Sequence, residues 1–76
     1  MNELIPHIDK IHTTPMGMGR IARNLNIPES NVMDTCRDIV RHGTQTRRGK
    51  NIYVTYAGMT LTIHARALTI ITGKRI

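Results

Sequence analysis

The spacing of apolar positions changes halfway along this chain of 76 residues. Up to about residue 43 the apolar side chains recur every three or four positions, which is the period of a helix. From residue 44 they alternate with polar side chains, which is the period of a strand. The first helical stretch lies within residues 2–12, with Asn2 as its N-cap. Its apolar positions are Leu4, Ile8 and Ile11.

Two further helices are predicted before the period changes. Thr14 and Pro15 are typical of the N-cap and the first helical position, so a helix is expected to begin there. The next helix falls within residues 28–43, and we expect Gly43 to end it in the left-handed conformation. The two apolar stripes consist of Met18, Ile21, Ala22 and Leu25, and of Val32, Cys36, Ile39 and Val40.

Four short strands are predicted in the second half. They are the runs TQTRR, NIYVTY, TLTIHA and LTIIT. Turns at residues 49–50 and 57–59 connect the first three runs as an antiparallel meander. The link at residues 66–67 contains no turn residue, so we expect a bulge or a short irregular connection there. The inward face of the second run is expected to carry Ile52, Val54 and Tyr56.

Helices followed by strands indicate an α+β fold, with two to three N-terminal helices packed on a three- to four-stranded antiparallel meander. The length allows a single domain over residues 1–76, with a helical layer over 1–43 and a basic sheet over 44–76. Because the chain has no Trp or Phe, its core is expected to be aliphatic. A lone cysteine, Cys36, and the lack of a long apolar run predict a cytoplasmic protein that does not enter a membrane.

Charge separates the two halves of the chain. The formal net charge is +6, and residues 39–76 contain seven of the eleven Lys and Arg residues and none of the five acids. Basic side chains can also protect the exposed edge of a small sheet from aggregation. That role does not require the absence of every carboxylate over 38 residues. We therefore expect the sheet half to bind a polyanion.

The basic side chains of the sheet half are candidates for contacts with nucleic-acid phosphates. A tyrosine on the polar face of a sheet can stack on a base of a single strand. We accordingly expect a nucleic acid, RNA or DNA, as the partner. The candidate contact residues are Arg47, Arg48, Lys50, Tyr53, Arg66, Lys74 and Arg75. Other members of the polar face are Thr55, Thr62 and His64.

A helix-turn-helix is an alternative use of the same chain. Residues 19–43 contain two helical patterns joined by a turn and followed by a basic hairpin, as in a winged helix. Against this interpretation, Glu29, Asp34 and Asp38 would bring negative charge towards phosphates. Two further apolar strands also follow the hairpin. The outward residues of the recognition helix would be Asn31, Thr35, Arg37 and Arg41.

The sequence offers a single candidate for catalysis, His64, and the support for it is weak. A small antiparallel sheet behind N-terminal helices is similar to small metal-independent ribonucleases and ribonuclease toxins, in which a base activates the ribose hydroxyl. No carboxylate follows residue 38, and His7 and His12 are too far apart to share a helical face. His64 therefore has no acid–base partner that the sequence can identify. Its expected polar neighbours are Arg66, Thr69 and Thr72.

Over nearly its whole length the chain resembles an uncharacterised family of short bacterial and phage-associated domains. The likeness runs from IDKIHTT through RIARNLNI and RRGKNIYVT to TIITGKR. That family commonly has a tryptophan where this chain has Ile52, and alanine and histidine where it has Gly73 and Lys74. These differences weaken base stacking at the hairpin and catalysis at the last strand. The resemblance implies a single α+β domain and does not imply an activity.

The sequence therefore predicts a small non-enzymatic domain that binds nucleic acid without a cofactor or a metal ion. One alternative is a phage or mobile-element inhibitor that binds a host nucleic-acid-handling protein, similar to anti-CRISPR proteins. Another is a small metal-independent ribonuclease. The exposed edge of so small a sheet also predicts a homodimer.

Overall fold

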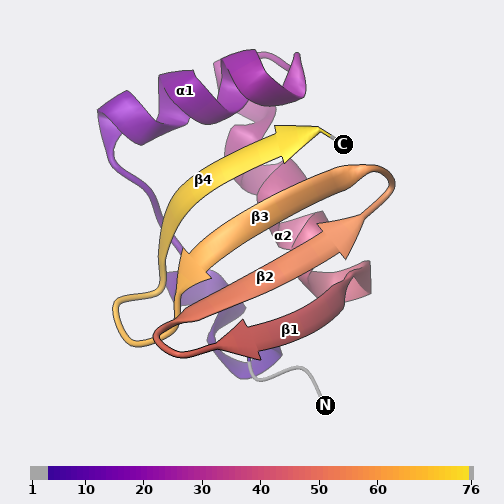
Figure 1. The fold of residues 1–76 in the computed structure, drawn as a ribbon. Helices are drawn as coiled ribbons and strands as arrows, with labels where there is room; N and C mark the ends of the chain where they lie inside the picture. The colour runs from indigo at the N-terminus through magenta and orange to yellow at the C-terminus, as the bar shows by residue number, and fades with distance from the viewer. Residues whose placement is uncertain (1–3, 76) are drawn as a thin grey trace.

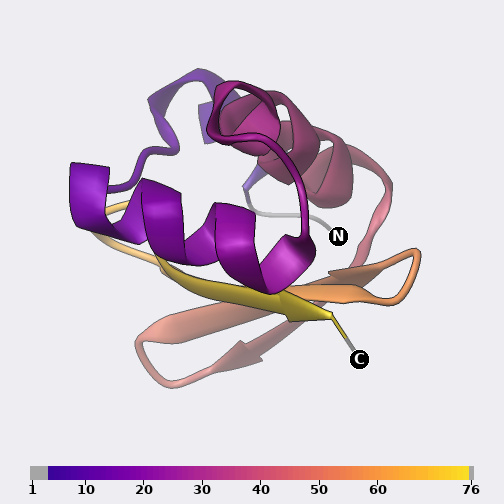
Figure 2. The ribbon, with the colours of Figure 1, turned by 90° about the horizontal axis from the view of Figure 1, so that it is seen from above.

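Helices cover one face of a four-stranded antiparallel sheet (Figure 1), and no other element of the described chain covers the opposite face (Figure 2). The computed structural model describes residues 4–75. Its helical elements are the 3-10 helix η1 (Ile5–Lys10), α1 (Pro15–Leu25), the 3-10 helix η2 (Glu29–Asn31) and α2 (Val32–His42). The strands, which pair in chain order, are β1 (Thr44–Arg48), β2 (Asn51–Tyr56), β3 (Met59–His64) and β4 (Thr69–Arg75). The predicted α+β fold with an antiparallel meander is confirmed.

The first predicted helix is a kinked 3-10 helix. Pro6 lies in its first turn, and His7 departs from helical geometry with φ −115° and ψ 16°. The apolar positions still reach the core, because Leu4 and Ile11 are buried. Asn2, the predicted N-cap, lies outside the described residues.

Helix α1 begins as the sequence predicted. The hydroxyl oxygen of Thr14 accepts the backbone N–H of Gly17 at 3.0 Å, and Pro15 occupies the first helical position. The helix ends at Asn26, which takes the left-handed conformation with φ 58°. Its stripe is buried at Ile21, Ala22 and Leu25, and Met18 is partly buried against the same core.

Helix α2 buries the four side chains that the pattern indicated, and Gly43 follows it. The prediction for Gly43 is wrong, because this residue is extended with φ −83° and ψ 168°. The chain therefore passes directly from the helix into β1 without a left-handed stop. Glycine stands there because a side chain would meet the carbonyl oxygens of Ile39 and Thr55 and a methyl group of Val54. The buried residues are Val32, Cys36, Ile39 and Val40.

Cys36 behaves as a small apolar core residue. Its side chain is fully buried, and this burial raises the pKa of the thiol to about 11. The thiolate, which is the nucleophilic and metal-binding form, is therefore disfavoured near neutral pH.

The sheet has a buried face and a polar face. Five aliphatic side chains on the helix-facing side are at most 2% exposed, and they are Ile52, Val54, Leu61, Ile63 and Ile70. Tyr56 was expected to join them. It is instead 41% exposed at the end of β2, where its ring lies 5.5 Å from the ring of His42.

The irregularity expected after β3 has two parts. Residues 65–68 form a turn in which Leu68 takes the left-handed conformation with φ 58°. The shift in register lies inside β4, because Thr62 pairs with Thr72 whereas Ile63 pairs with Ile70. Ile71 is the extra residue between these two pairs, and β4 continues past it, beyond the predicted LTIIT, as far as Arg75.

The extended segment before α1 adds one more pair to the sheet. His12 forms a parallel bridge with Thr69. Its N–H donates to the carbonyl of Leu68 at 3.0 Å, and its carbonyl accepts the N–H of Ile70 at 2.7 Å. This bridge places His12 beside the start of β4, although the two segments are far apart in the sequence.

Candidate nucleic-acid interface

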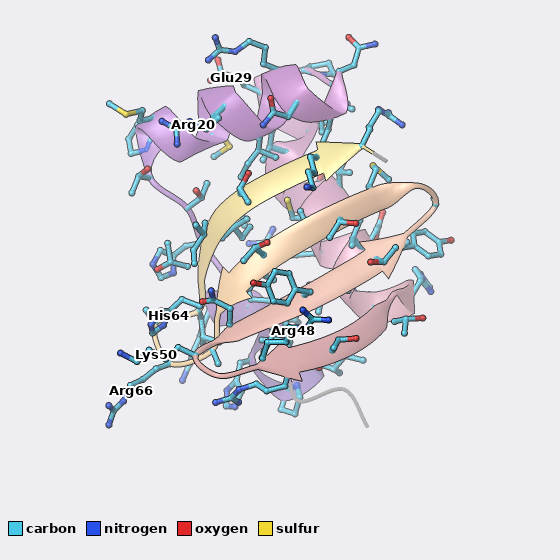
Figure 3. All side chains as sticks on the ribbon, viewed as in Figure 1. Arg20, Glu29, Arg48, Lys50, His64 and Arg66 are labelled. Atoms are coloured by element: carbon cyan, nitrogen blue, oxygen red, sulfur yellow. The ribbon has the colours of Figure 1, made fainter. Side chains whose placement is uncertain are left out.

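Two basic turns meet at one end of the sheet. The β1–β2 and β3–β4 turns lie side by side because alternate turns of a meander fall at the same end (Figure 1). The carbonyl of Lys50 accepts the N–H of Ala65 at 2.8 Å, which joins the two turns. Figure 3 shows Lys50, His64 and Arg66 gathered at this end of the sheet.

The two turns enclose a hollow of about 470 Å³, which we call the basic end. Lys50 and Arg66 are exposed there, and the Arg47 Nε donates to the carbonyl of Gly49 at 2.8 Å, which supports the tight turn. Gly49 has φ 60°, a conformation that favours glycine. The hollow is lined by Arg47, Gly49, Lys50, His64, Ala65 and Arg66. The structure thus brings together four residues that the sequence singled out.

The ion pairs of the described residues lie on a helix and not at the basic end. Within residues 4–75, the ion pairs closer than 4 Å are Arg37 with Asp34 at 3.9 Å and Arg41 with Asp38 at 3.2 Å, both on α2. In the described part of the chain, neither Lys50 nor Arg66 has a carboxylate at that distance. Because no acid of residues 4–75 forms an ion pair with these two cations, their charges add to one positive field.

The polar face of the sheet extends from the basic end towards Tyr53. Arg48 pairs with Asn51, and Thr46 pairs with Tyr53, so these four side chains share that face. A shallow hollow of about 260 Å³ lies between Thr46, Arg48 and Tyr53. Arg47 is on the other face, because it pairs with the buried Ile52. The two adjacent arginines therefore point to opposite sides of the sheet.

Lys74 and Arg75 lie at the opposite end of the sheet. They pair with Thr60 and Met59, next to the β2–β3 turn. The Arg75 Nε donates to the carbonyl of Leu25 at 2.7 Å and so satisfies an acceptor at the C-terminus of α1. The structure therefore gives Arg75 a structural contact and leaves the exposed Lys74 on the polar face.

Replacing Arg75 with methionine is expected to lower the free energy of unfolding by about 1 kcal/mol. The cause is the loss of the hydrogen bond to Leu25 and of a cation at the negative end of α1. Lys74→Met removes the same charge from the neighbouring residue and is expected to leave stability within about 0.5 kcal/mol. Urea unfolding followed by circular dichroism compares the two; equal losses would show that the Leu25 contact contributes nothing.

The residues of the helix-turn-helix alternative do not form a free basic surface. Arg37 and Arg41 are each close to an aspartate one turn earlier on α2, as described above. Thr35 is partly buried, whereas Asn31 is exposed. Helix α2 also packs on β2 and β3, so its buried side is committed to the sheet.

His12 is a residue that the sequence did not connect to the site. Its Nδ1 lies 3.0 Å from the carbonyl of Lys10, and its Nε2 lies 3.1 Å from the hydroxyl of Thr69. Thr69 in turn pairs with His64 across β3 and β4. The His64 Nδ1 accepts the N–H of Ala67 at 3.1 Å. The periodicity of the sequence does not predict that His12 lies near Thr69 and His64. One isolated bridge between His12 and Thr69 brings them together.

In the described residues 4–75, no helix has both the length and the apolar character needed to cross a bilayer. Nor do three His, Cys, Asp or Glu side chains of this part gather where they could hold a metal ion.

Fold and surface together define a small α+β domain with a basic, acid-free sheet. The chain belongs to the family described as "Protein of unknown function (DUF3781)", whose model matches residues 5–74. The expected membership of an uncharacterised family of short domains is thereby confirmed. No curated protein and no solved structure matches the chain.

Proposed function

We propose that this protein is a small basic domain that binds nucleic acid through its sheet. The observation that carries the proposal is the basic end, where two turns separated by β2 and β3 bring Arg47, Lys50 and Arg66 around one hollow. These cations provide contacts for consecutive phosphates of a backbone. Arg48 and Lys74 extend the positive surface over the polar face.

A single strand fits this surface better than a duplex. Tyr53 lies in the middle of a sheet face that is uncovered by other described elements (Figure 2), so its ring is available to a base. Stacking of bases on an aromatic residue of a sheet, with cations along the backbone, is the usual arrangement for single-stranded RNA or DNA. With a single tyrosine on the face, we expect little preference for sequence.

The test is a salt-titrated binding survey. Labelled single- and double-stranded RNA and DNA of equal length are titrated with the protein at several salt concentrations, and binding is followed by fluorescence anisotropy. We expect the single strands to bind more tightly than the duplexes. Their affinity is expected to fall as salt rises, because Lys and Arg side chains that bind phosphates displace the counterions condensed on the nucleic acid. The proposal fails if none of the four ligands binds at about 50 mM salt, or if affinity is independent of salt.

The phage association and the inhibitor role remain alternatives that the same surface can serve. A protein partner would use the basic end to contact an acidic groove of a host nucleic-acid-handling enzyme. Capture from host lysate before and after nuclease treatment separates the two interpretations. A partner protein that survives the treatment favours the inhibitor, whereas partners that disappear with the nucleic acid favour direct binding.

A further inference from the structure

Five polar side chains form a row across the polar face beside the basic end. His12 bridges to Thr69, Thr69 pairs with His64, His64 with Asn51, and Asn51 with Arg48. Residues that pair directly across a sheet share a face, so the five side chains point to the same side. We call this set the His12–Arg48 row. The row adds His12, a group able to accept a proton, which the sequence did not place near His64.

The hydrogen bonds give the two neutral histidines opposite tautomers. A carbonyl oxygen can only accept, so the bond to Lys10 places the proton of His12 on Nδ1 and leaves a lone pair on Nε2. That lone pair accepts the hydroxyl of Thr69. A backbone N–H can only donate, so the bond from Ala67 leaves the proton of His64 on Nε2. His12 thus presents a base, and His64 presents a donor.

His12 has the surroundings of a general base. Its ring is held by a backbone carbonyl on one side and already contacts a hydroxyl on the other, which is the relation of a general base to the hydroxyl that it activates. His12 is exposed, so a ribose hydroxyl can replace the Thr69 hydroxyl at Nε2.

A phosphate that reaches both histidines would lie above Thr69, which stands between them on the same face. Neighbouring strands are about 4.8 Å apart, so the backbones of His12 and His64, with Thr69 between them, are separated by about 10 Å. Lys50 and Arg66 line the hollow that His64 also lines. Tyr53 is two residues along β2 from Asn51, on the same face, where it can hold a base next to that phosphate.

We infer that this site cleaves single-stranded RNA by attack of a ribose 2′-hydroxyl on the adjacent phosphodiester, an inference that rests on the proposed binding of nucleic acid. The His12 Nε2 takes the proton of the 2′-hydroxyl, and the 2′ oxygen forms a bond to phosphorus. The bond from phosphorus to the 5′ oxygen of the next nucleotide breaks, and the Lys50 ammonium protonates that oxygen.

The products are a 2′,3′-cyclic phosphate and a free 5′-hydroxyl, and no other reactant is consumed. Protonated His12 and neutral Lys50 return to their starting forms by exchanging one proton through solvent. During the reaction His64 donates its Nε2–H to a non-bridging phosphate oxygen, and Arg66 stabilises the charge that develops on the phosphate. DNA, which lacks the 2′-hydroxyl, is bound and not cleaved.

The experiment uses a single-stranded DNA oligonucleotide that contains one ribonucleotide, with EDTA present because the step requires only side chains. The wild-type protein is expected to cut on the 3′ side of that ribonucleotide and to leave a cyclic phosphate there. An all-DNA oligonucleotide of the same sequence is the matched substrate. Products are separated by denaturing electrophoresis and their ends identified by mass spectrometry, and binding is measured on the same samples.

The variants are His12→Asn and His64→Ala, with His7→Ala as the control. His7 is exposed on η1 and belongs to neither the row nor the basic end. At saturating oligonucleotide, the loss of His12 is expected to lower the cleavage rate constant about 100-fold or more, which is the usual contribution of a general base. His7→Ala is expected to cleave like the wild type, and preparing all proteins in parallel reveals a contaminating nuclease.

Each outcome decides between the two levels of the proposal. If the wild type binds the oligonucleotide and leaves it intact, the cleavage inference is wrong and the binding function stands. Cleavage by His12→Asn at the wild-type rate also overturns the inference, because the activity then belongs to another site or protein. If the oligonucleotide does not bind at low salt, both proposals fail. Should His12→Asn unfold, His64→Ala decides in its place: a lower cleavage rate constant than the wild type supports the inference, and cleavage at the wild-type rate overturns it.

Discussion

Replacing Lys50 and Arg66 together with glutamate is expected to weaken the binding of single-stranded RNA about 100-fold at about 0.1 M salt. The two cations come from the two turns that line the basic end, so the double variant replaces a positive charge with a negative one on each turn. Each lost phosphate contact also makes the negative slope of log affinity against log salt less steep, by about 0.7 for a single strand. Anisotropy titrations at several salt concentrations measure both quantities.

The matched control is Arg20→Glu with Arg23→Glu on α1. Both arginines are exposed, and Figure 3 shows Arg20 on the helix at the far side of the molecule from Lys50 and Arg66. Each substitution changes the charge by two units, so both double variants have a formal net charge of +2 instead of +6. A general electrostatic attraction would weaken equally in the two variants. Equal losses would therefore contradict a specific interface at the basic end.

Gly43→Ala is expected to lower the free energy of unfolding by about 2–4 kcal/mol. A Cβ on Gly43 would lie 2.5 Å from the carbonyl oxygen of Ile39, 2.6 Å from a methyl group of Val54 and 2.9 Å from the carbonyl oxygen of Thr55. Two of these three atoms belong to the backbone, so relief requires that α2 move away from β2. The whole domain is expected to have only about 4–11 kcal/mol of stability, so the loss is a large fraction.

Gly49→Ala is the comparison for Gly43→Ala, because it is expected to destabilise the protein for a different reason. No atom lies within 4 Å of the Cβ that it would gain, but the residue has φ 60°. Alanine there costs about 1 kcal/mol from backbone strain alone. Urea denaturation of both variants, followed by circular dichroism, gives the order. A Gly43 variant as stable as the Gly49 variant would show that α2 and β2 can separate without cost.

The secondary structure could be predicted from local pattern because local physics determines it. Thr14 and Pro15 begin α1 through a hydrogen bond and a fixed φ that involve only neighbours. Alternation placed Ile52 and Val54 on the buried face. The prediction failed at Gly43, where a nearby strand rather than a helix stop requires glycine. It also failed at Tyr56, where the end of β2 leaves the ring exposed.

The candidate site was predicted in part. Charge alone singled out Lys50 and Arg66, and the structure places both at one hollow. Charge alone could not separate Arg75, whose guanidinium is held by the carbonyl of Leu25, 50 residues away. Periodicity could not place His12 either, because it indicates which face of one element is buried and not which two elements become neighbours.

The sequence by itself determined the change of period near residue 43, the hydrophobic core and the absence of acids from the sheet half. These properties depend on the order of residue types and on nearest neighbours. Only the tertiary structure decided that the two basic turns share one hollow and that His12 lies beside Thr69, in a row with His64. Such proximity depends on strand order and register, which are fixed when the apolar faces of the sheet and helices pack together.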